Sequence, residues 1–513
     1  MAANIPNQGS TWGVGALLAT AAIAVAVALG IIPLVWFALA YGGQFKLDAY
    51  IWNVLQFTLL QTFLSTALSV LPAIFVARAL ARQQFRGRGF LLAAFSVPLT
   101  LPAIVAVFGL AAIYGASGLF GGAFPFYGIG GIVLTHVFFN LPLATRILLE
   151  AMQQAPAENH RLAAQLNFSD SAMWRHVDWP VLRPVLPRLL ALVALLCAGS
   201  FVIVLTLGGP AATTLEVAIF QSLRMDFDVS RAVTLSFLQI AFSGLLVWAA
   251  GSLALSPATQ APLRLGHYRL DGQSTASWLL DFSALAVAGL LVLPPLAGLI
   301  GTGIFHVNLN AALLTAFVTS LGVAAASACV CLLLAWPLAL AQFRHPNWRG
   351  TFTVVTLAGL IVPPAVLATG WFLALRSVGG SVVQVALLII ALNSLMALPF
   401  AATVLAPALE RSAAQHDRLC AHLGLQGIAR LRLIDFPSNK STVLQALLMA
   451  FTLSFGDLAA VTLLGNQGII TLPALLSQQM GNYRGADAGG TAVVLALMCF
   501  AASLLAQRES SRT

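Results

Sequence analysis

Charged residues are scarce in this chain of 513 residues, since Asp, Glu, Lys and Arg together make up 8% of it. An ordinary soluble domain contains about 25%. Hydrophobic residues make up 59%, which excludes a soluble globular protein and indicates an integral membrane protein. About 20 apolar residues cross the hydrocarbon core as a helix. Twelve runs reach roughly that length: 13–41, 53–80, 90–113, 127–150, 189–208, 232–254, 278–304, 311–341, 351–375, 381–405, 443–465 and 488–507.

Cysteine is also scarce. The five cysteines, at positions 197, 329, 331, 420 and 499, are an odd number scattered along the chain. Cys329 and Cys331 are two residues apart, so on a helix they do not face each other. This pattern predicts neither a disulfide framework nor a zinc site. Catalytic residues are not expected either, because acid, base, nucleophilic and metal-ligating groups do not cluster as a membrane enzyme would require.

Only two lysines are present, and neither belongs to an ATP-binding loop. Such a loop needs glycines flanking four residues, followed by Lys and then Ser or Thr. Lys440-Ser441 imitates its end, but Ile434 and Asn439 occupy the glycine positions. We therefore expect no cofactor on this chain and place any ATP and Mg on a separate partner. No basic run is interleaved with aromatic residues, so nucleic acid is not an expected partner.

The basic residues predict the orientation, because short loops rich in Lys and Arg are retained in the cytoplasm. With the N-terminus inside, every basic residue is cytoplasmic except Lys46, Arg224, Arg231, Arg376 and Arg484. This predicts a multi-pass membrane protein with both termini cytoplasmic. The net charge of +9 then reflects topology and attraction to anionic membrane lipid. The first apolar run is too long for a cleaved leader, so we expect the first helix to be retained.

One polar loop occurs twice in the same frame. The first copy runs from Arg161 to Asn167 and then through Val177-Asp178-Trp179-Pro180, and the second runs from Arg418 to Gly424 and then through Ile434-Asp435-Phe436-Pro437. The turn residue, Asn167 or Gly424, precedes its proline by 13 positions in both copies, and the copies lie 257 positions apart. The repetition indicates two equivalent docking points on one side of the membrane.

The residue types in this loop predict two short helices joined by a turn. Ala163-Ala164 and Ala421 have small side chains that let a partner approach closely. Asn167 and Gly424 tolerate the left-handed conformation that ends a helix. Pro180 and Pro437 are expected to stop the second helix before the next span.

The duplication extends beyond the loops. At the same separation of 257, Pro142 matches Pro399 and Gly208 matches Gly465. We expect an all-α fold of twelve transmembrane helices in two parallel six-helix repeats. The repeats are 1–259 and 278–513, joined by a polar cytoplasmic linker at 260–277, and the duplicated loops lie at 151–187 and 406–440.

The loops resemble the coupling loops of the permease subunits of binding-protein-dependent ATP-binding-cassette importers. That loop begins acidic-Ala-Ala, has a glycine four residues after the second Ala, and ends hydrophobic-x-hydrophobic-Pro. The departures here are Arg161 and Arg418 for the acidic residue, Leu162 and Leu419 for the first Ala, Cys420 for the second Ala, and Asn167 for glycine. The resemblance implies the type I importer fold.

The resemblance also implies partners and a solute. Two copies of a cytoplasmic ATP-binding subunit would grip the loops, and one periplasmic solute-binding protein would deliver the solute. The residues expected to couple to the ATPase are Ala163, Ala164, Asn167, Pro180, Ala421, Gly424 and Pro437. Stretches such as 68–80, 136–142 and 208–215 are most similar to thiamine permeases, which implies transport of thiamine or its phosphate esters. A ferric-iron permease is the alternative within the family, and a stand-alone secondary transporter is the alternative outside it.

Four residues are candidates for the solute pathway. Asp457 is an ionisable group inside a predicted span, where such groups default to function, and at the separation of 257 its counterpart is Ser200. Its carboxylate could attract a cation, or it could bond backbone freed at Gly456 or pair with Arg484. Phe108 and Trp371 follow proline-containing stretches and could stack on an aromatic solute, or face lipid or neighbouring helices. His136 is expected to bond between helices instead of binding a ligand.

Overall fold

The structure is a computed structural model that describes residues 10–40, 48–121, 125–154, 156–252, 274–375, 381–465 and 468–510. All regular elements in these ranges are helices. The predicted linker lies outside the described residues from 260 to 273.

The first half contains α1 (Ser10–Ala40), α2 (Ala49–Arg82), α3 (Arg88–Ser96), α4 (Ala103–Tyr114), α5 (Ile129–Gln153), α6 (Ala157–Gln165), α7 (Asp170–Met173), α8 (Trp179–Leu182), α9 (Leu186–Ala198), α10 (Phe201–Leu207), α11 (Leu215–Arg224) and α12 (Val229–Ser252). The second half contains α13 (Thr275–Gly303), α14 (Ala311–Arg344), α15 (Arg349–Thr356), α16 (Ala358–Ile361), α17 (Pro364–Leu375), α18 (Val382–His422), α19 (Gly427–Arg430), α20 (Phe436–Phe455), α21 (Ala459–Leu464), α22 (Leu472–Gly481) and α23 (Gly485–Ser510).

Within the described ranges, eight helices are long and apolar enough to cross a membrane, or ten if two bent pairs each count as one span. One pair joins α3 to α4 with a bend of 120°, just before Pro102 and α4. The predicted runs 351–375 and 443–465 fall on α15–α17 and α20–α21, which are interrupted at Pro363 and Gly456. The all-helical membrane class is confirmed, and twelve crossings stay a prediction.

The duplication is visible in α2 and α14, which are both 34 residues long and both end on arginine, at Arg82 and Arg344. Each begins with the same kind of cap. The Asp48 carboxylate accepts from the Ile51 N–H at 2.8 Å, and the Asn310 amide oxygen accepts from the Leu313 N–H at 2.8 Å. Such side-chain oxygens satisfy N–H groups that have no partner within the helix.

The same two helices also hold the start of a short helix further along the chain. The Thr58 hydroxyl on α2 accepts from the Leu215 N–H of α11 at 3.0 Å. The Ser320 hydroxyl on α14 accepts from the Leu472 N–H of α22 at 2.8 Å. The two bonds occupy equivalent places, since α11 and α22 both begin one residue after the matching Thr214 or Thr471.

The first helix of each half packs against the other half. Helix α1 lies on α14 and α17, and α13 lies on α2, α4 and α23. Small residues allow this close approach: a Cβ added at Gly370 would fall 1.6 Å from the Gly30 carbonyl oxygen, and one at Gly109 would fall 2.7 Å from the Pro295 carbonyl oxygen. Neither half is therefore spatially self-contained, although the two repeats are separate in sequence.

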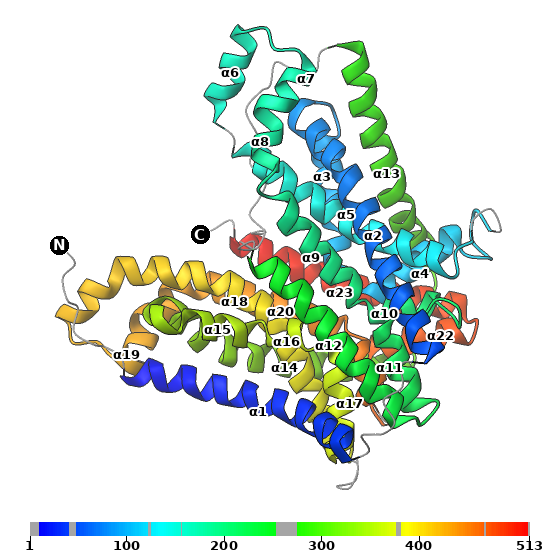
Figure 1. Cartoon of the computed structure of the whole chain (residues 1–513), viewed down its shortest axis with the longest axis vertical. Coiled ribbons are helices and arrows are strands. Elements are labelled where there is room, and N and C mark those ends of the chain that lie inside the picture. The colour runs from blue at the N-terminus through cyan, green and yellow to red at the C-terminus, as the bar shows by residue number, and fades with distance from the viewer. Residues whose placement is uncertain are drawn as a thin grey trace.

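Figure 1 shows two arms that diverge from a shared junction. One arm contains α2, α3, α5, α9 and α13 and carries α6 at its far end. The other contains α1, α14, α15, α18 and α20 and carries α19 at its far end. The junction contains α10, α11, α17 and α22. The two duplicated loops thus lie at the ends of separate arms.

Candidate coupling loops and solute pathway

Both predicted turn residues adopt the left-handed conformation, with φ of 49° at Asn167 and 64° at Gly424. Their hydrogen bonds also match. Asn167 N–H donates to the Ala164 carbonyl at 3.1 Å, and Gly424 N–H donates to the Ala421 carbonyl at 3.3 Å. The next N–H closes on the carbonyl five residues earlier, at 3.0 Å in the first copy and 2.9 Å in the second. These bonds satisfy the last carbonyls of each helix, as in other helix ends of this type.

The small residues of the loop are placed differently from one another. Ala163 is buried against Met173 and Val177 inside the loop, and its counterpart Cys420 is buried too. Ala164 is half-buried, and Ala421 is exposed. Small size at Ala163 and Cys420 therefore allows the loop to pack on itself.

Exposed leucines form the outer surface of each short helix. Leu162 and Leu166 in the first copy are 57% and 59% exposed, and Leu419 and Leu423 in the second copy are 47% and 62% exposed. Residues four apart share one helix face, so each loop presents a matching leucine pair. From the sequence, Leu162 and Leu419 were noted only as departures from the family pattern. The signal for this surface was a second leucine four residues later in both copies, at Leu166 and Leu423.

The expectation that Pro180 and Pro437 stop a helix is wrong. A π-helical turn precedes each proline, at Trp174–Asp178 and Leu431–Asp435, and the chain continues into the next helix. A proline ring would collide with the carbonyl four residues earlier, and the wider turn moves that carbonyl aside. Each proline then lies in the first turn of α8 or α20, where its missing N–H costs nothing.

Ion pairs connect the loops to the long helices. In the first half, Arg78 of α2 pairs with the buried carboxylate of Asp178 at 3.0 Å. In the second half, Arg344 of α14 lies 3.7 Å from Asp417, which also accepts from Arg430 at 2.5 Å. Arg430 in turn lies 3.2 Å from Asp435, the equivalent of Asp178. These ion pairs therefore tie each duplicated loop to α2 or α14.

Comparison with known proteins identifies the family. No family model matches the chain. The thiamine transport system permease protein ThiP of Brucella melitensis is 41% identical over 499 residues, which cover 92% of this chain and 91% of the relative. ThiP of Escherichia coli is 39% identical over 476 residues, 88% of each chain, and ThiP of Salmonella typhimurium is 37% identical over 518 residues, 96% of each chain. The chain belongs to the ThiP family of transport permeases.

In this ThiP-family chain, the two predicted pathway residues Ser200 and Asp457 lie at equivalent helix breaks. The first break separates α9 from α10 at Gly199-Ser200, and the second separates α20 from α21 at residues 456–458. The Asp457 carboxylate accepts from the Ala459 N–H at 3.2 Å and from the Ala460 N–H at 2.8 Å. It therefore bonds backbone freed by the break, the structural alternative stated for it, and Arg484 pairs with Asp487 instead, at 2.6 Å.

Ser200 belongs to a hydrogen-bonded chain through His136. The Gln61 amide nitrogen can only donate, so His136 Nδ1, 3.0 Å away, accepts. His136 Nε2 then carries the proton and donates to Ser200 Oγ at 2.7 Å, which donates to the Cys197 carbonyl at 2.9 Å. His136 is a neutral bridge between α2, α5 and the α9–α10 break, and its predicted role between helices is confirmed.

Phe108 and Trp371 are both buried. Trp371 Nε1 donates to the Ala26 carbonyl of α1 at 2.9 Å, so the indole holds α17 of the second half against α1 of the first half. Phe108 lies on α4 beside Gly109, the residue in close contact with Pro295 of α13. Neither ring contacts Asp457 or Ser200 among the described residues, and the role of Phe108 and Trp371 toward the solute stays a prediction.

Glu216 was not among the residues predicted from the sequence. This residue lies in the first turn of α11, a helix of ten residues that is not among the candidate spans. It is fully buried, and neither carboxylate oxygen has a hydrogen-bond partner among the described residues. Burial raises the pKa of the Glu216 carboxyl to about 8. Only one part of the signal that selected Asp457 applies to Glu216, namely the lack of an acidic counterpart, since the residue at the separation of 257 is Pro473.

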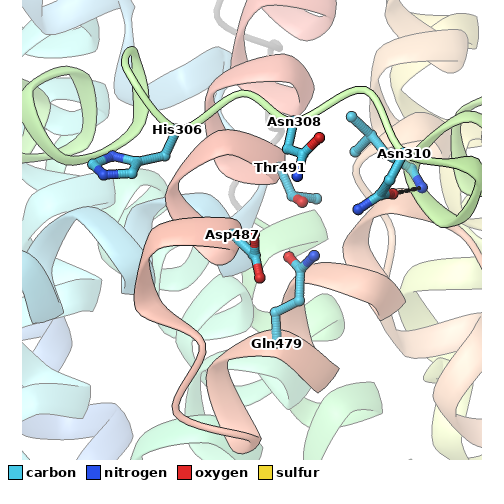
Figure 2. Close-up of a pocket in the computed structure, with 7 residues that line it drawn as sticks. His306, Asn308, Asn310, Gln479, Asp487 and Thr491 are labelled. Atoms are coloured by element: carbon cyan, nitrogen blue, oxygen red, sulfur yellow. Dashed lines mark hydrogen bonds between the residues drawn. The ribbon is translucent and has the colours of Figure 1, made fainter.

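Polar side chains also surround a small depression near α22 and α23, shown in Figure 2. Gln479 and Asp487 point toward Asn308 and Thr491 there, while the Asn310 side chain is engaged in capping α14. The depression contains none of the predicted pathway residues. No group of three or more His, Cys, Asp or Glu side chains is arranged to hold a metal in the part of the chain that the structure describes.

Proposed function

We propose that this chain is the transmembrane permease subunit of an ATP-driven importer that moves thiamine, or its phosphate esters, into the cytoplasm by alternating access. The observation that carries the proposal is the similarity to ThiP proteins over about nine tenths of the chain. Thiamine is a permanent aromatic cation, so acidic and aromatic groups suit its recognition.

The duplicated loop supports the partners. Two docking points of the same geometry suit two copies of one cytoplasmic ATP-binding subunit, which would hold the ATP and Mg that this chain does not bind. Leu162, Leu166, Leu419 and Leu423 would enter the ATPase surface, beside the predicted coupling residues. One periplasmic binding protein would deliver the solute on the opposite side.

The topology follows from the same assignment. Both loops must be cytoplasmic to meet the ATPase, which agrees with the basic residues around them. Twelve crossings in two parallel repeats, with both termini cytoplasmic, complete the arrangement. We place the protein in the bacterial inner membrane, with the four interrupted helix groups (α3–α4, α9–α10, α15–α17 and α20–α21) counted as one crossing each.

The test is transport by the complete assembly in proteoliposomes, which contain this chain, its ATPase and a thiamine-binding protein. We expect uptake of labelled thiamine that requires ATP and stops when the ATPase carries an inactive phosphate-binding lysine. Ferric iron, supplied with an iron-binding protein, is the comparison solute. Iron uptake without thiamine uptake would overturn the assignment of the solute, and thiamine uptake driven by an ion gradient without the ATPase would overturn the transporter class.

A further inference from the structure

Glu216 is a buried carboxylate without an internal partner. A carboxylate removed from water is costly unless a proton, a hydrogen-bond donor or a cation neutralises it. None of the described residues donates a hydrogen bond to Glu216. Asp457, the acid of the other half, accepts two backbone N–H groups instead. The Asp457 carboxylate is therefore satisfied by backbone donors, whereas the Glu216 carboxylate has no donor among the described residues and could still bind a cation.

The surroundings of Glu216 place it at the first helix break. Its Oε1 atom lies 4.0 Å from the position that a Cβ on Gly199 would occupy. Gly199 itself is exposed, and the next residue, Ser200, is partly exposed. The carboxylate thus lies just beneath a point on the surface that no side chain covers.

The repeat indicates which way that open point faces. The equivalent glycine, Gly456, is covered by Pro102 at the start of α4, since a Cβ there would lie 2.7 Å from the proline ring. Pro102 belongs to the other half of the chain, so this contact crosses between the halves. Pro364 is the proline that aligns with Pro102 in the repeat, and neither it nor Pro363 lies within 4 Å of the Cβ position on Gly199. The repeat therefore predicts that the uncovered face of Gly199 is directed toward the opposite half.

We infer that Glu216 is the residue that receives the positively charged ring of the transported solute, at the uncovered break between α9 and α10. The inference rests on the proposed function and deepens it, because it assigns recognition of the positively charged ring of that solute to one side chain. A proton neutralises the carboxyl at rest, and it leaves to water when the cation arrives. A single carboxylate without further donors would bind such a cation and also release it.

The experiment compares a cation with a neutral analogue in the reconstituted assembly. The solutes are thiamine and an analogue whose thiazolium ring is replaced by an uncharged thiophene. We expect Glu216→Gln to lower thiamine import at least tenfold while import of the neutral analogue stays constant or rises. Stimulation of ATP hydrolysis by the loaded binding protein should persist. Glu216→Asp, which keeps the charge, should retain more thiamine import than Glu216→Gln.

Asp457→Asn is the matched control, because it removes the acid at the other break and leaves a side chain that can still accept a backbone bond. It should affect both solutes equally. Unchanged thiamine import in Glu216→Gln, equal loss of both solutes, or a cation-selective loss in Asp457→Asn alone would each overturn the inference. If Glu216→Gln fails to assemble, Glu216→Asp decides by the same ratio of the two solutes. Absence of thiamine import by the unaltered assembly would instead contradict the proposed function.

Discussion

Ser200 and Asp457 occupy equivalent positions, yet their side chains satisfy the two breaks by different means. Ser200 bonds to the Cys197 carbonyl and to His136, so its break is held by neighbouring helices. Asp457 bonds to the N–H groups of the helix that follows it. The sequence predicted that these two positions are equivalent, and their role toward the solute stays a prediction. It did not identify Glu216, because that residue comes from a connection that the hydropathy pattern places outside the membrane.

The turn residues of the loops give a test at the same scale. Replacing Asn167 and Gly424 together by Val places a β-branched residue in a left-handed conformation twice, at a cost of about 1 to 2 kcal/mol for each turn. We expect thiamine import and stimulated ATP hydrolysis to fall together while the chain still inserts into the membrane.

The measurement is transport and ATP hydrolysis in the reconstituted assembly, with membrane insertion checked by fractionation. Gly322→Val serves as the control, because Gly322 lies on α14 with nothing within 4 Å of its Cβ position and no left-handed φ. Undiminished transport in the double variant would contradict the docking role of the loops.

At the scale of elements, the sequence predicted the positions of the apolar helices well, but it did not predict reliably where a proline interrupts a helix. Pro102 lies at the break between α3 and α4, and Leu101 before it is extended, because the residue before proline is driven away from helical geometry. Pro180 and Pro437 do not break the helical path, because a π turn makes room for each ring. Residue types alone do not distinguish these outcomes, since the carbonyl that the ring would strike is positioned by hydrogen bonds that form only in the folded loop.

The packing of α1 and α13 against the opposite half also could not be predicted from the sequence. An apolar helix carries no mark of which half it will contact, since lipid and protein interiors are similarly apolar. Glycines such as Gly30, Gly109 and Gly370 indicate that another helix packs closely at these positions, but they do not indicate which helix it is. The relatives and the fold confirm the permease, whereas the assignment of its partners depends on experiments.

Gly370 tests this exchange directly. Gly370→Ala would place a methyl group 1.6 Å from the Gly30 carbonyl oxygen, so α1 and α17 must separate. Overpacking of this kind costs about 1 to 3 kcal/mol. We expect a lower thermal unfolding temperature in detergent and faster proteolysis of α1.

Gly322→Ala is the matched control for that measurement. It adds a methyl group to open space in a helix interior, where alanine is favoured over glycine by about 1 kcal/mol. Its unfolding temperature should stay constant or rise. An unaltered unfolding temperature in Gly370→Ala would show that α1 does not depend on this contact.

At the scale of the whole molecule, each arm contains helices from both halves of the sequence, as Figure 1 shows. Helix α1 lies on α14 and α17, and α13 lies on α2 and α4. Stability is therefore shared between the repeats. A half without its counterpart would expose faces that the other half normally covers.

This arrangement predicts the behaviour of the chain when it is divided. Residues 1–259 and 260–513, produced as two polypeptides, should each be degraded when expressed alone, because α1 then lacks α14 and α17, and α13 lacks α2 and α4. Expressed together, they should assemble and restore thiamine uptake to a thiamine-requiring strain that lacks its own permease. Stable accumulation of either half alone, measured by immunoblot of membranes, would contradict a shared interior.

The two 34-residue helices, α2 and α14, predict when movement at the duplicated loops would reach the other end of each arm. Each is roughly 50 Å long at 1.5 Å per residue. Near one end each is bound to a duplicated loop through arginine, and near the other it holds the first N–H of α11 or α22. If each loop binds one ATPase subunit, as proposed, two helices of equal length would carry both movements to the opposite side of the membrane at the same time. Both arms would then move together, whereas the proposed cation site at Glu216 lies in one half only. A single ATP-driven cycle would therefore open that one site from both sides at the same time.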